Sequence, residues 1–131
     1  MANISTYLSN KLLDHAFGGS AYTQPTVYLA LFTTTPTMPA GTGGTEVTGG
    51  SYARVAIGGD MAAASSESKT SNADITFTTA TANWGTVVGV GIYDASSSGN
   101  LLAAGNLTAS ETVNSGDTFK ISSGSLSIAL N

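Results

Sequence analysis

The first hydrophobic pattern in the chain is helical. Apolar residues recur at every fourth position from Ile4 to Ala16, which is the spacing of one face of an α-helix. Asn3 or Ser5 can cap the start of this helix, and two glycines stop it after Phe17. We therefore predict one short helix from Asn3 to Phe17. Because a helix of this length is marginal on its own in water, we expect it to pack on its own sheet or on a neighbouring subunit.

Beyond Pro25 the pattern changes to short apolar or alternating runs separated by turn residues, which is typical of β-strands. The run Thr26–Phe32 is almost continuously apolar, so we expect this strand to be covered on both faces. Glycines at 85, 89 and 91 in the longest run indicate bulges or a close approach of the backbone. Strands are predicted at 26–32, 52–57, 73–78, 84–95, 101–108, 111–113, 118–122 and 125–130.

About eight strands with turn signals every 8–12 residues predict an all-β fold. The expected architecture is an antiparallel β-sandwich, jelly-roll-like, with one short N-terminal α-helix. The 131 residues fit a single domain, in which residues 1–20 form a helical arm and residues 21–131 the β-sandwich body. Loops longer than about 12 residues are often functional. We therefore predict that the loop at 33–50, which has room for a short strand at 46–48, is a contact arm.

Charge is scarce in this chain. Asp, Glu, Lys and Arg make up 9% of the residues, where about 25% is usual for a soluble domain. Because the cores of protein interfaces are also depleted in charge, this composition favours a protein that hides part of its surface against other chains. The net charge of −4, with four scattered cations and no cysteine, argues against nucleic-acid binding and excludes disulfides. No apolar run approaches the roughly 18 residues that span a membrane, and the N-terminus lacks the features of a signal peptide.

Catalytic side chains are also few. His15 is the single histidine, and Asp14 beside it faces another way on a helix, so we predict no Ser-His-Asp site and no enzyme activity. Without cysteine or a metal-ligand spacing, neither a metal site nor a cofactor is expected. The best candidate for a calcium ligand, Asp94, is better explained as the first residue of a hairpin turn. Trp84 and most tyrosines stand in predicted strands, which favours core packing over a sugar-stacking platform.

Arg54 is the only arginine, and it stands in the middle of a predicted strand. In so charge-poor a chain we expect it to have a fixed carboxylate partner. Glu46 is close enough in sequence to be this partner across a hairpin bend. The pair would be structural by default, and the alternative is that it joins two subunits.

Three blocks of the chain resemble a family of short tailed-phage virion proteins. The blocks are ANISTYLSNKLLDHAFGGSAYTQPTVYLALFTTTPT, GTEVTGGSYARVAI and ADITFTTATANWGTVVGVGIYDASSSGNLLAAGNLTASETVNSGDTF. Their most specific parts are GTEV-x-GG-x-YAR and the Trp-Gly…Gly-Ile-x-Asp-Ala element. Members are commonly labelled phage tail fibre or minor tail proteins, and occasionally capsid decoration (cement) proteins. The resemblance covers nearly the whole chain and implies a virion component with no catalytic residues to carry over.

Within that class we predict a capsid decoration protein that stabilises the shell by bridging neighbouring capsid subunits. One compact domain with an arm and a long loop suits such a clamp, and a homotrimer would fit local threefold positions. The alternative is a tail fibre or minor tail protein that binds a host surface receptor. The expected partners are other virion proteins, on the capsid surface or in the tail, and neither nucleic acid nor membrane. The residues predicted to contact partners are Tyr7, Leu8, Lys11, Leu12, His15, Met38, Glu46 and Arg54.

Overall fold

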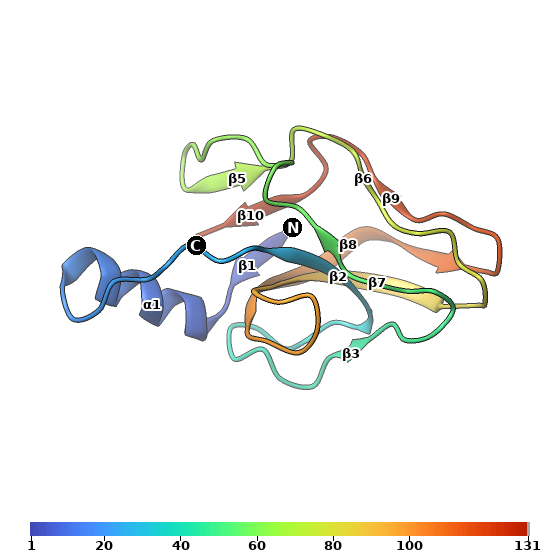
Figure 1. Cartoon of the computed structure of the whole chain (residues 1–131), viewed down its shortest axis with the longest axis horizontal. Helices are drawn as coiled ribbons and strands as arrows, with labels where there is room; N and C mark the ends of the chain where they lie inside the picture. Colours follow the sequence, from blue (N-terminus) through green and yellow to red (C-terminus); the bar gives the residue numbers. More distant parts are fainter. Residues whose placement is uncertain (131) are drawn as a thin grey trace.

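β-strands in two unequal layers form the body of the protein, and a single helix extends from one end (Figure 1). The computed structural model describes residues 1–130. The elements are β1 (Ala2–Ile4), α1 (Thr6–Phe17), β2 (Tyr28–Thr34), β3 (Thr45–Glu46), β4 (Val55–Ala56), β5 (Ser68–Thr70), β6 (Ile75–Thr76), β7 (Gly85–Tyr93), β8 (Leu101–Val113), β9 (Lys120–Ile121) and β10 (Ser127–Ala129). The prediction of an all-β, sandwich-like fold with one short N-terminal helix is confirmed.

The larger layer is an eight-stranded sheet in the order β3–β2–β7–β8–β1–β10–β5, and β4 pairs with the part of β2 that β3 leaves free. Neighbouring strands are antiparallel except β1 and β10, which run parallel. The smaller layer consists of β6 and β9 alone. Residues 2–4 form a strand between β8 and β10, although the sequence predicts that the helix already begins at Asn3. The helix therefore grows directly out of the main sheet.

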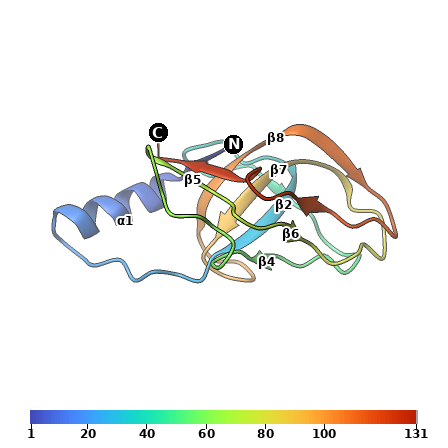
Figure 2. The same ribbon diagram turned by 90° about the horizontal axis from the view of Figure 1, so that it is seen from above.

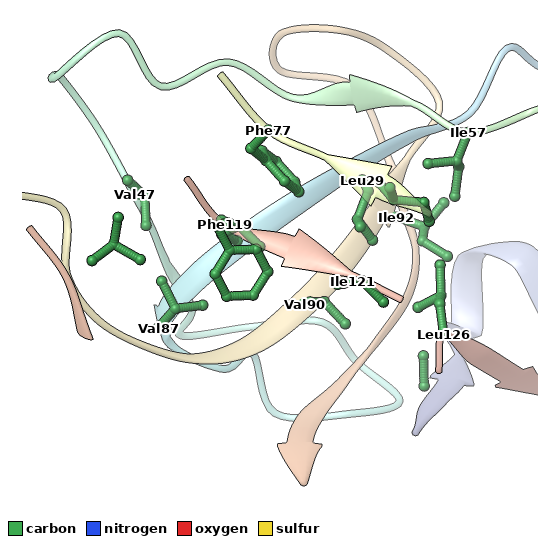
Figure 3. Packing of buried hydrophobic residues seen from close by; sticks show 14 of the residues in the cluster. Leu29, Val47, Ile57, Phe77, Val87, Val90, Ile92, Phe119, Ile121 and Leu126 are labelled. Atoms are coloured by element: carbon green, nitrogen blue, oxygen red, sulfur yellow. The ribbon is translucent and has the colours of Figure 1, made fainter. Parts of the chain in front are cut away.

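The hydrophobic core lies between the two layers (Figure 3). Leu29 and Leu31 of β2 and Val90 of β7 are fully buried and belong to this core. Phe77, next to β6, and Phe119, next to β9, cover them from the smaller layer. The two phenyl rings pack edge to face with centroids 5.8 Å apart. Because burying a side chain of this size contributes about 1.5–3 kcal/mol, the packing of these two rings stabilises the contact between the layers.

The loop between β2 and β3 covers the opposite face of the main sheet. Phe32 is buried on that face, outside the core cluster, and stacks on Tyr93 with centroids 6.3 Å apart. Gly91 of β7 makes room for this ring, because a Cβ atom there would overlap it. Leu101 of β8 meets the loop at Gly41. The predicted covering of β2 on both faces is thus confirmed, and this part of the predicted contact arm lies against its own sheet.

Strand boundaries differ from the prediction where pairing is irregular or distant. The segments predicted separately at 101–108 and 111–113 are one strand, β8, of which residues 107–110 lie opposite Val88 alone. The register shift next to Gly89 confirms the bulge that the glycines indicate. β5 lies in a region without strand periodicity and pairs with β10 at the edge of the sheet.

α1 projects beyond the end of the body instead of lying across it (Figures 1 and 2). Its start is well anchored, because the buried Ser5 is the N-cap: its Oγ accepts a hydrogen bond from the Leu8 amide at 3.2 Å and donates one to the Leu101 carbonyl at 2.6 Å. No residue of the helix is buried, and every residue from Lys11 to Ser20 is exposed. The protein therefore combines a packed body with a helix that is held only at its root.

Candidate functional site

The predicted contact residues on α1 divide into anchoring and exposed ones. Tyr7 and Leu8 are partly buried and pack against the core cluster, so they fasten the helix to the body. The exposed Lys11 lies with its Nζ 5.6 Å from the centre of the Tyr7 ring. His15 is exposed, and its Nδ1 accepts a hydrogen bond from the Tyr22 amide at 3.0 Å, which ties the returning chain to the helix.

The remaining side of α1 is apolar. Leu12 is 36% exposed, and two further side chains are more so: Leu13 at 56% and Phe17 at 84%. Together with Ile4 and Leu130 of the body they line an open groove. The sequence-based choice of contact residues missed Leu13 and Phe17, because it followed the i+4 stripe through Leu12. Leu13 and Phe17 lie beside that stripe and broaden the apolar face of the helix, and this pattern in the sequence could have identified them.

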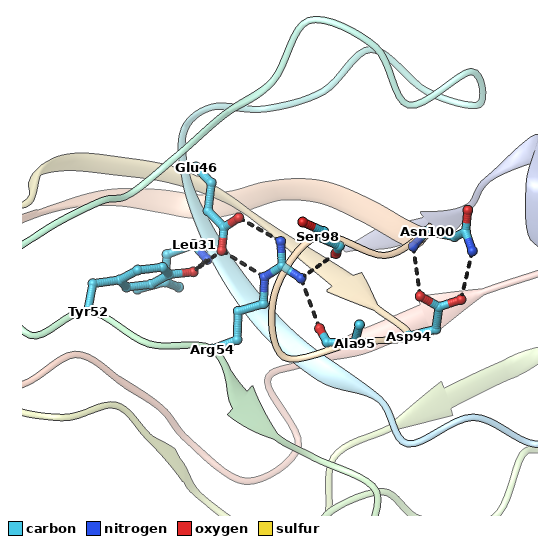
Figure 4. A network of polar contacts seen from close by, with 8 residues as sticks. All are labelled: Leu31, Glu46, Tyr52, Arg54, Asp94, Ala95, Ser98 and Asn100. Carbon is cyan, nitrogen blue, oxygen red and sulfur yellow. Dashed lines mark hydrogen bonds and ion pairs between the residues drawn. The ribbon is translucent and has the colours of Figure 1, made fainter.

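The second group of predicted residues forms a polar clamp (Figure 4). Arg54 Nε and Nη2 donate to the two carboxylate oxygens of Glu46 at 2.9 and 2.8 Å. Its Nη1 donates to the carbonyl oxygens of Ala95 and Ser98 at 2.9 and 2.8 Å. The guanidinium also lies over the ring of Tyr93, 3.7 Å from its centre. The predicted Glu46–Arg54 pair is confirmed, and it forms within one chain.

Tyr52 extends the clamp into the core. Its hydroxyl donates to Glu46 Oε2 at 2.6 Å and accepts from the Leu31 amide at 3.0 Å. Burial raises the pKa of Glu46, but hydrogen bonds from Arg54 and Tyr52 outweigh it and hold this pKa below its ordinary value of 4.5. The bond to Glu46 raises the pKa of Arg54, and burial together with Glu46 raises that of Tyr52. The charged pair and the neutral phenol therefore persist at neutral pH, where none of them is suited to transferring a proton.

The hydrogen bonds of Arg54 in the clamp are all made to groups of the same chain. Four of the five N–H groups of Arg54 are used, and its side chain is only 7% exposed. Its effect is to hold the turn between β7 and β8 against the edge of the sheet at β3. Asp94 closes the same turn. Its carboxylate accepts one hydrogen bond from the backbone amide of Asn100 at 2.7 Å and another from the side-chain amide of Asn100 at 3.0 Å. The interpretation of Asp94 as the first residue of a hairpin turn is confirmed.

Two further residues considered in the sequence analysis, Met38 and Trp84, lie within the body. Met38 is partly buried in the β2–β3 loop, beside Met1 and Ala104. Trp84 is 5% exposed, and its Nε1 donates to the Gly50 carbonyl at 2.9 Å. The prediction that Trp84 serves core packing is confirmed, and it offers no platform for a sugar.

Residues 1–130 contain neither a cluster of metal ligands nor a membrane-spanning helix. No three or more histidine or acidic side chains come together there in a way that could hold a metal ion. No helix in the same part of the chain has the length and apolar character needed to cross a membrane.

Comparison with known proteins decides the class of the protein. A family model described as Podophage GP4 fiber I protein gp80 matches residues 3–129. The chain belongs to this family. Membership in the podophage fibre family confirms the resemblance to phage virion proteins, so the protein is a structural component of a phage virion. Among curated proteins, no match to the chain is found.

Proposed function

We propose that the protein is a component of the phage tail fibre. The observation that carries this proposal is the family match, because it spans residues 3–129 and the family is described as a fibre protein. The match supports the predicted alternative, a tail protein, better than capsid decoration. The structure also weakens the argument for a clamp across capsid subunits, since the β2–β3 loop packs on its own sheet where Gly41 meets Leu101.

In this role the protein acts through its surfaces and not through catalysis. The clamp around Arg54 is saturated by its own chain, and His15, the single histidine, stands on the helix. The body provides a rigid block, in which both ends of β2 are tied to neighbouring strands. The partners that fit such a block are other virion proteins of the fibre and the tail.

Localisation on the particle tests the proposal. Antibodies raised against the purified protein should label the tails of intact virions in electron micrographs, while antibodies against the major capsid protein label the heads on the same grids. Quantitative mass spectrometry should give a copy number far below that of the major capsid protein. Labelling over the heads, with a copy number comparable to the capsid protein, would overturn the tail assignment in favour of capsid decoration.

A further inference from the structure

Exposed apolar side chains gather along one side of α1 and at its root. Among the described residues, four of the five large hydrophobic side chains that are exposed lie here. We call this surface the helix patch; it consists of Ile4, Leu12, Leu13, Ala16, Phe17 and Leu130. α1 projects beyond the body (Figure 2), and Leu13, Phe17 and Leu130 of the patch are at least half exposed among residues 1–130.

Charge is segregated from the helix patch. At 100° per residue, Lys11 falls on the side of α1 opposite to Leu13, and Asp14 and His15 flank Lys11. No charged side chain is among the residues that line the groove of the patch. Burying this side of the helix therefore desolvates no charged side chain among the groove-lining residues that the structure describes, which is the arrangement found in the cores of protein interfaces.

The helix patch contains both a projection and a hollow. Phe17 stands out at the end of the helix with 84% of its surface exposed. Beside it is a groove of about 340 Å³, whose walls include Ile4, Leu12 and Leu130. A cavity of about 150 Å³ is enough to accept a benzene ring. The groove can therefore hold the phenyl ring of a second Phe17.

The exposed area of the helix patch suits self-association. An aromatic side chain can bury roughly 150–250 Å² of surface, and Phe17 leaves most of its surface exposed to solvent. With the three leucines, the patch exposes on the order of 400 Å² of apolar surface, which matches the largest patches on typical monomers. A standard interface takes about 800 Å² from each partner. The patch thus supplies about half of what one copy needs, as an apolar centre to be surrounded by the polar residues of the helix and the body.

We propose that the helix patch is the contact between copies of this chain, with Phe17 of one copy seated in the groove of another. Because projection and groove lie on the same surface, every copy in a closed ring both gives and receives a phenyl ring. The proposal concerns self-association in solution and does not rest on the assignment to the tail.

Light scattering coupled to size-exclusion chromatography tests this contact over a range of protein concentrations. We expect the wild-type chain to elute with the mass of an oligomer and Phe17→Ser to weaken association by about 10-fold or more, because it removes a central aromatic side chain. Lys11→Ser, on the opposite side of the same helix, is the matched control and should leave the mass unchanged. Phe17 is exposed in one copy, so its replacement should not lower the melting temperature of the dissociated chain.

Disulfide trapping tests directly whether Phe17 of one copy lies in the groove of another. The method suits this protein because the chain contains no cysteine. An equimolar mixture of Phe17→Cys and Leu130→Cys chains should form a covalent pair of the two variants on mild oxidation, and a mixture of Lys11→Cys with Leu130→Cys should not. A wild-type chain that stays monomeric at every concentration would overturn the proposal and assign the patch to another protein. An oligomer that Phe17→Ser leaves intact, or that gives no trapped pair, would overturn it as well.

Discussion

Removal of Arg54 should destabilise the body more than the loss of any other charge. The variant Arg54→Met keeps an unbranched side chain over Tyr93 but removes two hydrogen bonds to Glu46 and two to backbone carbonyls. Breaking a fully buried ion pair by removing one partner costs about 3–5 kcal/mol. The side chains of Arg54 and Glu46 are 7% and 23% exposed. Because water still reaches part of the carboxylate, we expect the free energy of unfolding to fall by about 2–4 kcal/mol.

Urea unfolding followed by tryptophan fluorescence measures this loss. Trp84 is the single tryptophan, and its buried ring packs edge to face on Tyr52 at 5.5 Å, so its emission reports on the core beside the clamp. The matched control is Lys120→Met, which breaks an exposed ion pair with Asp74 of 3.6 Å. Such a surface pair contributes between about 0 and 1 kcal/mol. If Arg54→Met lowers the free energy of unfolding no more than Lys120→Met does, the clamp does not stabilise the body.

A double variant separates the pair itself from the charge that it leaves behind. In Glu46→Leu with Arg54→Met, no unpaired ion remains in the clamp. Replacing both members of a buried pair by apolar groups is often close to neutral. We therefore expect the double variant to lose less stability than the sum of the two single variants. A loss equal to that sum would mean that the two side chains act independently.

Three further variants and conditions address other parts of the fold. Because the pKa of Glu46 in the folded protein lies below 4.5, the clamp should contribute fully above about pH 4.5 and less as the pH falls below it; urea unfolding from pH 7 to 3 should show a decline that Arg54→Met lacks. Gly91→Ala should lower the free energy of unfolding by about 1–3 kcal/mol, because its methyl group overlaps Phe32, and an unchanged melting temperature would contradict this. Ser5→Ala should cost about 1–2 kcal/mol and reduce the helical circular dichroism signal, because the N-cap is lost; an unaltered spectrum and stability would rule out that role.

Sequence reasoning succeeded where the information is local or the choice is small. The helical spacing and the capping residue predict α1, and the glycines in the segment 84–95 predict the bulge where β7 pairs with β8. Arg54 is the only arginine, and few carboxylates stand near it, so Glu46 could be chosen as its partner. In each case the deciding residues are close in sequence or unique in the chain.

Features that depend on distant parts of the chain could not be predicted in this way. β1 pairs with Ala104 of β8 and Ile128 of β10, residues about a hundred positions away, and Ile4 fits a helix as well as a strand. The burial of Phe32 depends on the open space at Gly91, which lies beside it only once β2 and β7 are paired. Which side of α1 faces outward depends on how Tyr7 and its neighbours root the helix in the body.

The positions of the charged residues in the structure explain the effect of the low charge content. Of the few charged residues, Glu46 and Arg54 satisfy each other in the clamp, and Asp94 closes a turn, so these three do little to keep neighbouring molecules apart. A soluble monomer normally relies on exposed charge for that purpose. The apolar side of α1 around Phe17 has none. A body stabilised by an internal ion pair and a helix left uncharged on its open side form a molecule suited to assembly, and the place where that assembly should begin is α1.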